Sequence, residues 1–187
     1  MATSRKFLDW FFEAKTRNTL RRMEADDNYQ FIRLNYLFKQ FSTDAMAFIL
    51  EHLVERRYNR DDLIFKEENP SICFFIIKQG SAEIFVTPSS GEKIIYETVS
   101  AGQLFGEVSV ISASSRTASA RALEGDTILL VLSTFDLEEL CKMFPVDGLK
   151  LLRAILGRIT NYLVTTTRSL RTVQAELHVA REEAAKR

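Results

Sequence analysis

The fold is decided by residues 72–86, which read ICFFIIKQGSAEIFV. Two runs rich in β-branched and aromatic residues, Ile72–Ile77 and Ala82–Val86, stand on either side of Gln79-Gly80-Ser81, a combination typical of a turn. Each run has the length of a single strand, and the few residues between them leave no room for a helix. The stretch therefore predicts two short strands joined by a turn.

The same pattern of short β-like runs separated by turns continues on both sides of these two strands. Short β-like runs occur at Leu63–Phe65, Ile94–Val99 and Thr127–Leu132. Turn signals separate the runs, at Asn69-Pro70, Pro88-Ser89-Ser90-Gly91, Ala101-Gly102 and Glu124-Gly125-Asp126. A Rossmann-type sheet needs crossover helices, for which these intervals have no room. We therefore expect an antiparallel sandwich or barrel of roughly eight strands.

Helical patterns precede the strand-rich region. From Arg5 to about Met23, apolar residues share one face of a helix, namely Phe7, Trp10, Phe11 and Ala14. A second helix is expected after the cap Ser42-Thr43-Asp44, because apolar residues repeat there at helical spacing, at Met46, Ile49, Leu50, Leu53 and Val54. The first helix has basic flanks suited to an anionic membrane, but its acidic residues Asp9 and Glu13 favour docking on the barrel or on a partner subunit.

A long helix is expected after Pro145. Its apolar positions alternate steps of three and four in a heptad register with one polar member, at Leu149, Leu152, Leu156, Ile159, Leu163, Thr166, Leu170, Val173, Leu177 and Ala180. Glu176 and Arg181 then fall at g and e positions, which face each other with opposite charge in a parallel dimer. The alternative is a helix that packs only on its own barrel, but about 45 Å of helix outruns so small a domain. We therefore expect a homodimer formed by a coiled coil.

Composition excludes several classes of function. The chain has 187 residues with Lys+Arg and Asp+Glu at 25 each, so it lacks the basic excess typical of a nucleic-acid-binding protein. No stretch approaches the ~20 apolar residues of a membrane span, and the first residues do not resemble a signal peptide. Cys73 and Cys141 match no metal or redox spacing, which predicts buried, reduced thiols in a cytoplasmic protein.

The residues between positions 102 and 120 carry the groups that bear on function. Gly106 allows the backbone to approach a ligand closely, and Glu107 presents a carboxylate suited to a sugar diol. Backbone amides at the first turn of the next helix form an anion site, and Arg116 offers a permanently charged planar group to a phosphate. Together they form a nucleotide-sized site with no nucleophile or general base. The alternative is a surface ion pair between Glu107 and Arg116, which the preceding Phe105-Gly106 and the barrel context disfavour.

This segment resembles the phosphate-binding cassette of the cyclic nucleotide-binding domain family. The resemblance rests on Phe105-Gly106-Glu107, on Ser109 two positions later, and on Arg116-Thr117-Ala118 after a short helix. It extends from about Leu37 to Leu163, since Leu37–Ser42 is similar to the family's entry helix and residues 58–80 are similar to its first hairpins. Membership implies a mainly β fold with flanking helices, in which a double-stranded β-helix or jelly-roll barrel has N-terminal helices and a long C-terminal helix.

The resemblance also implies which residues contact a cyclic nucleotide. Glu107 would bind the ribose 2′-hydroxyl and Arg116 the cyclic phosphate, within a ligand-binding set that comprises Phe105, Gly106, Glu107, Val108, Ser109, Arg116, Thr117 and Ala118. The long helix would close over the base, and its polar mid-helix residues are the capping candidates, namely Asn161, Tyr162, Thr165 and Thr166. Neither a cofactor nor a metal is expected, and the ligand is cAMP or cGMP.

Three positions depart from the family pattern or leave the ligand undecided. Ser115 stands where the family often has proline before the arginine, which predicts a less rigid loop. Asp61-Asp62 replaces the usual pair of glycine and an acidic residue at a tight turn. Thr117 is a residue that cGMP-preferring members use, but cAMP-responsive channels carry the same Arg-Thr-Ala. The base therefore stays undecided, with cAMP favoured over cGMP.

We expect three regions: an N-terminal amphipathic helix at residues 1–29, a nucleotide-binding barrel with its entry helix at residues 30–145, and the dimerising helix at residues 146–187. The expected function is that of a receptor whose C-terminal helix moves on ligand binding and acts on an unidentified effector protein. We expect that the protein is not an enzyme and that it binds neither nucleic acid nor a membrane surface. Two alternatives stay open: a dimeric scaffold of the same fold that binds no nucleotide, and a regulatory fragment of a larger protein.

Overall fold

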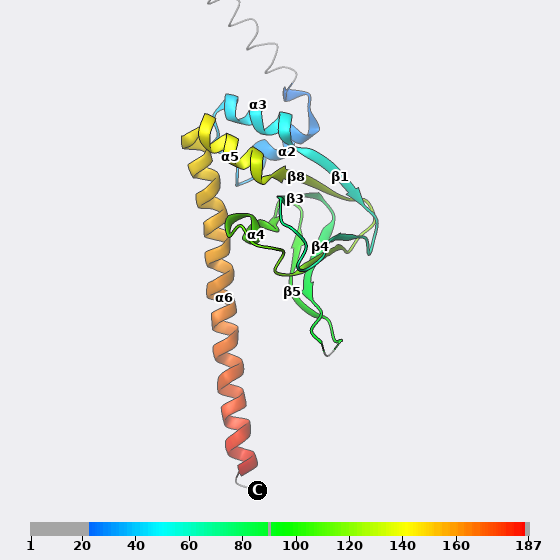
Figure 1. The fold of residues 1–187 in the computed structure, drawn as a ribbon, viewed down its shortest axis with the longest axis vertical. Helices are drawn as coiled ribbons and strands as arrows, with labels where there is room; N and C mark the ends of the chain where they lie inside the picture. The colour runs from blue at the N-terminus through cyan, green and yellow to red at the C-terminus, as the bar shows by residue number, and fades with distance from the viewer. Residues whose placement is uncertain (1–22, 90, 186–187) are drawn as a thin grey trace, which may run out of the picture. The chain divides into compact units, whose positions relative to one another are not determined.

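The computed structural model describes residues 23–89 and 91–185. The amphipathic helix predicted from Arg5 to Met23 lies outside these residues except for its last position. The chain divides into two compact units, one that extends to Lys150 and one that begins at Leu151. The first unit contains every strand that the structure describes, together with helices α2 to α5 and the first turn of α6 (Figure 1).

Within the described residues, two complete helices precede the strands, α2 (Asp27–Leu34) and α3 (Thr43–His52). Asp26 caps α2, because its side chain accepts hydrogen bonds from the amides of Asn28 and Tyr29 at 2.8 and 3.1 Å. The region boundary expected after residue 29 falls inside this helix. The predicted region from residue 30 therefore begins part-way through an element that the structure forms as a unit.

The entry helix expected at Leu37–Ser42 is not formed. These residues make consecutive turns, in which the amide of Phe38 donates to the carbonyl of Asn35 (3.1 Å) and the amide of Phe41 to that of Phe38 (2.9 Å). The side chain of Asn35 interrupts the helix, because its Oδ1 accepts from the amide of Leu37 at 3.0 Å and competes with a helical continuation. Ser42 caps α3, as its position in the sequence predicts.

Eight antiparallel strands form two four-stranded sheets, with the orders β1-β8-β3-β6 and β2-β7-β4-β5. The strands are β1 (Val54–Tyr58), β2 (Leu63–Phe65), β3 (Cys73–Gln79), β4 (Ser81–Val86), β5 (Ile94–Ser100), β6 (Leu104–Phe105), β7 (Ser119–Ala122) and β8 (Thr127–Ser133). The predicted fold class, a β-barrel of the jelly-roll type with flanking helices and a long C-terminal helix, is confirmed.

The chain passes from one sheet to the other at Gly80. Its backbone is left-handed, with φ at +82°, and a Cβ there would lie 2.5 Å from Oγ1 of the buried Thr127. Only glycine combines this conformation with this close approach. The two strands of residues 72–86 are therefore consecutive without being paired: β3 pairs with β8 and β6, whereas β4 pairs with β5 and β7.

The barrel core lies between the two sheets. Its buried members come from both sheets, and they are Phe75, Ile77, Ala82, Val99, Phe105, Ala120 and Leu129. Three phenylalanine rings stack within it, with the centroid of Phe75 at 5.6 Å from that of Phe65 and at 5.2 Å from that of Phe105. This aromatic stack lies under the candidate site.

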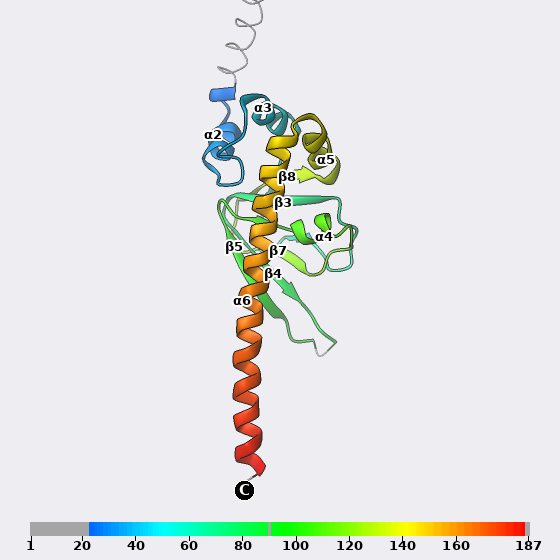
Figure 2. The same cartoon turned by 90° about the vertical axis from the view of Figure 1, so that its left-hand side faces the viewer.

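The remaining helices are α4 (Glu107–Ile111), α5 (Thr134–Met143) and α6 (Pro145–Ala185). A capping box formed by Ser133 and Asp136 begins α5 directly after the last strand. Helices α2, α3 and α5 lie together at one end of the strands, and the β4–β5 hairpin projects at the other end (Figures 1 and 2).

The first turn of α6 is fastened to the start of α3. One carboxylate oxygen of Asp147 accepts a hydrogen bond from Oγ of Ser42 at 2.7 Å, and the other accepts one from Nζ of Lys150 at 2.8 Å. Asp147 is buried, and burial would raise its pKa, but hydrogen bonds from Lys150 and Ser42 outweigh burial and lower it. The carboxylate is therefore ionised at neutral pH and holds the two helix ends together.

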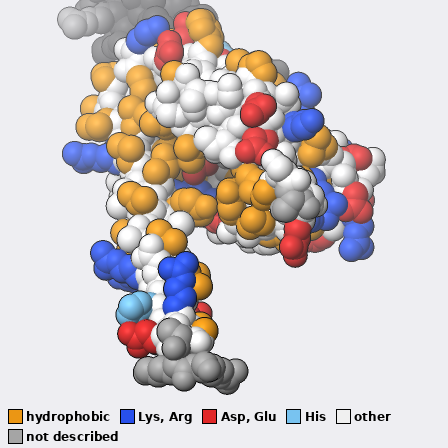
Figure 3. All heavy atoms as spheres, turned by 60° about the horizontal axis from the view of Figure 1, so that its bottom comes forward, with side chains coloured by type: hydrophobic (Ala, Val, Ile, Leu, Met, Phe, Trp, Pro, Cys, Tyr) orange, Lys and Arg blue, Asp and Glu red, His pale blue; other side chains and the backbone are white. Residues whose placement is uncertain are grey.

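The second unit consists of helix α6 from Leu151 onward. Four leucines at heptad a positions, Leu156, Leu163, Leu170 and Leu177, are 50, 62, 56 and 49% exposed in the single chain. Figure 3 shows apolar side chains at the surface of this helix among charged ones. Within the described residues, no helix is long and apolar enough to cross a bilayer.

Candidate functional site

Gly106 joins strand β6 to helix α4 and occupies the tightest position of the site. Its φ is +77°, in the left-handed region, and it caps α4. A Cβ at this position would lie 2.8 Å from Nη1 of Arg116, 3.3 Å from the ring of Phe75 and 3.4 Å from that of Phe65. Glycine is therefore required both by the backbone conformation and by the three side chains that surround it.

The first turn of α4 buries two polar side chains, those of Glu107 and Ser109, which are 5 and 2% exposed. Arg116 is only 4% exposed. The interpretation of Glu107 and Arg116 as a surface ion pair is therefore wrong, because both charges are buried. Taking two charges out of water costs free energy that hydrogen bonds and a bound counter-charge can offset.

The backbone of Arg116 is fixed to the loop between β2 and β3. Its amide donates to the carbonyl of Asn69 at 2.9 Å, and its own carbonyl accepts from the amide of Glu68 at 2.9 Å. The Oγ of Ser119 accepts from the amide of Glu67 at 3.0 Å in the same region. These bonds continue the pairing of β2 with β7 up to the arginine, so the position of its Cα is set by the barrel.

The guanidinium of Arg116 is directed inward, onto backbone carbonyls and aromatic rings. Nη1 donates to the carbonyl of Gly106 and Nη2 to the carbonyl of Cys73, each at 2.7 Å. The guanidinium carbon lies 4.2 Å from the ring centroid of Phe65 and 5.5 Å from that of Phe75. Four residues from three segments of the chain thus hold one cation in a single orientation.

One donor of this cation has no acceptor. Nε of Arg116 is buried and lacks a hydrogen-bond partner among the described residues. A buried N–H without an acceptor costs about 1–3 kcal/mol, and more when the group is charged. Burial also lowers the pKa of Arg116, although Cys73 and Glu107 act to raise it. The site therefore stands to gain from an anion that accepts from Nε.

The family comparison agrees with this geometry. Residues 55–144 match the family model described as the cyclic nucleotide-binding domain. The barrel is a cyclic nucleotide-binding domain. The matched residues begin in β1 and end just after α5, and they include both Glu107 and Arg116.

Relatives of the domain occur in regulatory proteins of different length. The chain is 29% identical over 122 residues to the Cyclic AMP receptor protein of Thermus thermophilus. This alignment covers 65% of this chain and 56% of that protein. The chain is 29% identical over 119 residues to human cGMP-dependent protein kinase 2, which covers 62% of this chain and 16% of that kinase. The chain therefore matches only part of the length of either relative.

The fold of the domain is similar to that of a solved structure, the catabolite activator protein of Thermus thermophilus. The two chains superpose with a TM-score of 0.62 at 27% identity, over 72% of this chain and 62% of the other. The similarity is thus to a regulatory protein that, like this chain, contains residues beyond the superposed part.

The structure brings most of the predicted ligand-binding residues of the domain together. Phe105 and Gly106 contact the arginine or its aromatic support, and Ala118 is buried on the same segment as Arg116. Thr117 and Val108 are exposed, so their side chains are open to solvent at the edge of the same segment. No group of three or more possible metal ligands occurs within the part of the chain that the structure describes.

The four base-capping candidates belong to the second unit. Asn161, Tyr162, Thr165 and Thr166 are all exposed, and Oγ1 of Thr165 donates to the carbonyl of Asn161 within the helix at 2.9 Å. Their contact with a nucleotide base stays a prediction.

Three contributors to the domain's site were not foreseen in the sequence, Cys73, Phe65 and Phe75. Cys73 supplies its carbonyl to Arg116, and its Sγ lies 3.6 Å from Nη2. Cys73 and Cys141 are free thiols that are half-buried, less than the full burial expected. Burial raises the pKa of the Cys73 thiol against the opposing effect of Arg116, so the thiol is protonated at neutral pH. Its carbonyl, and not its thiol, positions the cation.

Proposed function

We propose that this protein is a cyclic nucleotide receptor that favours cAMP over cGMP. The observation that carries the proposal is the buried Nε of Arg116, which has no acceptor among the described residues and lies in a guanidinium already oriented by Gly106, Cys73 and Phe65. A cyclic phosphate offers an anionic oxygen to such a donor, and a charge-assisted hydrogen bond to phosphate is among the stronger polar contacts in proteins.

Glu107 is the proposed partner of the ribose. Its carboxylate can accept a hydrogen bond from the 2′-hydroxyl, which distinguishes a ribose from a deoxyribose. The amides of the first turn of α4 lack intrahelical acceptors, as at any helix start, and supply further donors to the phosphate. Phosphate and ribose are thus recognised by groups from one segment of the chain, residues 105–118.

The base of the nucleotide is the part of the ligand on which Thr117 and the relatives bear. Thr117 is exposed, and its hydroxyl suits a guanine contact, as in cGMP-preferring members of the family. The bacterial relative named for cyclic AMP and the human relative named for cGMP match this chain to the same extent, at 29% identity over 122 and 119 residues. The preference for cAMP rests instead on the similarity in fold to a bacterial catabolite activator protein.

The long helix α6 is the proposed output of the receptor. Its heptad leucines are exposed in the single chain, which supports a parallel coiled coil between two copies in the cytoplasm. Nucleotide binding would change how the helix is held and thereby change what the dimer offers to an effector protein. A ligand can produce this change only by binding one arrangement more tightly than the other.

Isothermal titration with cAMP and with cGMP, each against the wild type and Arg116→Ala, tests the proposal. Loss of the phosphate's charged partner should weaken binding by about 2–5 kcal/mol. The matched control is Arg60→Ala, which removes an exposed arginine that makes no ion pair with another described residue. Circular dichroism and thermal unfolding of both variants establish that the barrel is intact.

The alternative is a dimeric scaffold that binds no nucleotide. It is favoured by the internal hydrogen bonds of Arg116, whose two terminal nitrogens already donate to the carbonyls of Gly106 and Cys73. Absence of heat with both nucleotides, in folded protein freed of carried-over ligand, would establish this alternative and contradict the receptor.

A further inference from the structure

The charge on helix α6 is unevenly distributed along its length. Residues 151–175 contain four arginines and no acidic residue, whereas residues 176–185 contain three glutamates and one arginine. Opposite charges three or four residues apart stabilise an exposed helix, and like charges at such a spacing destabilise it. Arg168 and Arg171 are a like-charged pair of this kind. The basic stretch therefore gains from an anionic group that is supplied from outside the helix.

Three of these arginines are exposed on one side of α6, namely Arg153, Arg168 and Arg171. Arg153 and Arg171 are separated by roughly five complete turns at 3.6 residues per turn, so they point in the same direction. Arg168 precedes Arg171 by one turn and is its neighbour on the helix surface. None of the three forms an ion pair with another residue that the structure describes. Figure 3 shows basic side chains that project from this helix.

These arginines stay accessible in the proposed coiled coil. In the register that places Leu156 and Leu163 at position a, Arg153 falls at position e, Arg168 at f and Arg171 at b. Positions b and f face away from the partner helix, and position e lies at the edge of the seam. Dimerisation would therefore cover the leucines and leave two copies of the arginine-bearing surface open to solvent.

We propose that this arginine-bearing surface, defined by Arg153, Arg168 and Arg171, binds an acidic segment of the effector protein. Residues 151–185 contain arginines but no lysine. A guanidinium presents a planar set of donors that matches a carboxylate through two parallel hydrogen bonds, whereas an ammonium acts as a point charge. The surface thus suits the side chains of glutamate and aspartate. The proposal rests on the receptor proposal for the role of α6 as the output.

The length of the surface favours a protein segment over a nucleic acid. Arg153 and Arg171 lie about 27 Å apart along the helix axis, at 1.5 Å per residue. Beyond Arg171 the charge reverses, at Glu176, Glu182 and Glu183. A long polyanion that followed the helix would meet these glutamates and be repelled. A short acidic segment can pair with the arginines and end before them.

The side chains between the arginines do not suit a bilayer. A helix that lies in a membrane surface buries large apolar residues beside its basic ones. Val164 is the large apolar residue among the described side chains between the arginines, and the heptad leucines would be covered by the coiled coil. The other side chains on this side of the helix are small or polar, namely Ala154, Gly157, Asn161, Thr165 and Thr172.

The test measures binding of a fluorescein-labelled peptide to the full chain by fluorescence anisotropy. The peptide has about 20 residues of alternating glutamate and alanine, and the buffer contains about 50 mM salt, at which surface charges are weakly screened. Arg168→Gln, Arg171→Gln should weaken binding about tenfold, because the ion pairs of both arginines are lost. Arg168→Lys, Arg171→Lys should weaken it about threefold, since the charge is kept and the planar donors are lost.

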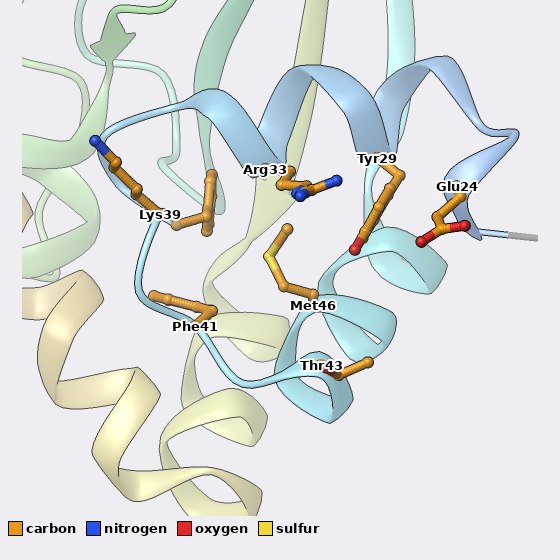
Figure 4. A pocket seen from close by; sticks show the side chains of 8 residues that line it. Glu24, Tyr29, Arg33, Lys39, Phe41, Thr43 and Met46 are labelled. Carbon is orange, nitrogen blue, oxygen red and sulfur yellow. The ribbon is translucent and has the colours of Figure 1, made fainter. Parts of the chain in front are cut away.

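The matched control is Arg33→Gln, Arg60→Gln, which removes two exposed arginines outside α6. Arg33 belongs to helix α2, and Figure 4 shows it beside Tyr29 and Met46 in a hollow that Glu24 also lines. This variant should change peptide affinity less than about twofold, because neither arginine belongs to the proposed surface.

Equal peptide binding by the wild type and the Arg168→Gln, Arg171→Gln variant, or an equal loss in the control, would overturn the proposal. Tighter binding, through the same arginines, to single-stranded RNA of about 20 nucleotides or to vesicles of phosphatidylcholine and phosphatidylserine (about 3:1) would overturn it in favour of a nucleic acid or a membrane. Titration of every variant with cAMP separates this proposal from the receptor proposal. A wild-type chain that binds the peptide but neither nucleotide would contradict the receptor proposal alone.

Discussion

At the scale of single residues, Phe65 supports the cation of the site. Its ring centroid lies 4.2 Å from the guanidinium carbon of Arg116, and a desolvated contact of this kind is worth up to about 2 kcal/mol. Phe65→Leu should therefore weaken cyclic nucleotide binding in isothermal titration by about 1–2 kcal/mol. Phe85→Leu is the matched control, because Phe85 lies near Lys93 and Arg121 and does not contact Arg116. An equal loss in both variants would show that Phe65 acts through stability alone.

The residue types of the site could be predicted from the sequence, but the hydrogen bonds and ring contacts that hold Arg116 could not. Gly106, Glu107 and Arg116 carry chemistry that is visible in their side chains, and the structure places them in one buried cluster. The acceptors of Arg116 are backbone carbonyls, including that of Cys73, and a carbonyl leaves no signature in the sequence. Phe65 read as an ordinary strand residue, because its contact with the arginine depends on the pairing of β2 with β7.

At the scale of elements, the heptad face of α6 gives a testable prediction about assembly. Leu163 is 62% exposed at a heptad a position, and its neighbour Val164 is 43% exposed at position b, which does not face the partner helix in a coiled coil. Leu163→Lys should weaken a coiled-coil dimer by about 3 kcal/mol or more, because two buried leucines become charged groups. Val164→Lys should leave the dimer unchanged in sedimentation velocity. A wild-type chain that sediments as a monomer, or a Leu163→Lys dimer as tight as the wild type, would contradict the coiled coil.

Strands with a continuous apolar run were predictable, including the short β2, whereas the charged β1 and the two-residue β6 were not. Residues 72–86, 94–99 and 127–132 read as strands and form β3, β4, β5 and β8. Strand β1 was hidden by its sequence, VERRY, in which three of five residues are charged and the first continued a helical pattern. It forms because every one of its residues pairs with β8, a contact distant in sequence.

At the scale of the whole molecule, the receptor proposal requires that ligand binding alter helix α6. Hydrogen exchange of residues 149–170, measured with and without saturating cAMP, should show a change in protection over this part of the helix. The same measurement on Arg116→Ala should show none, since the nucleotide no longer binds. Identical protection in wild-type protein with and without bound nucleotide would exclude helix coupling while leaving nucleotide binding intact.

The bond between Asp147 and Ser42 has a mechanical consequence for such coupling. Together with the bond from Lys150 to Asp147, it holds the first turn of α6 against the start of α3. The helix beyond this turn, Leu151–Ala185, is about 50 Å long at 1.5 Å per residue and acts as a lever arm. A rotation of about 5° at its base would displace the tip of a helix of this length by about 4 Å. If the proposed coupling holds, a small rotation around a bound ligand would become a movement of the helix tip that is large enough to alter a contact with another protein.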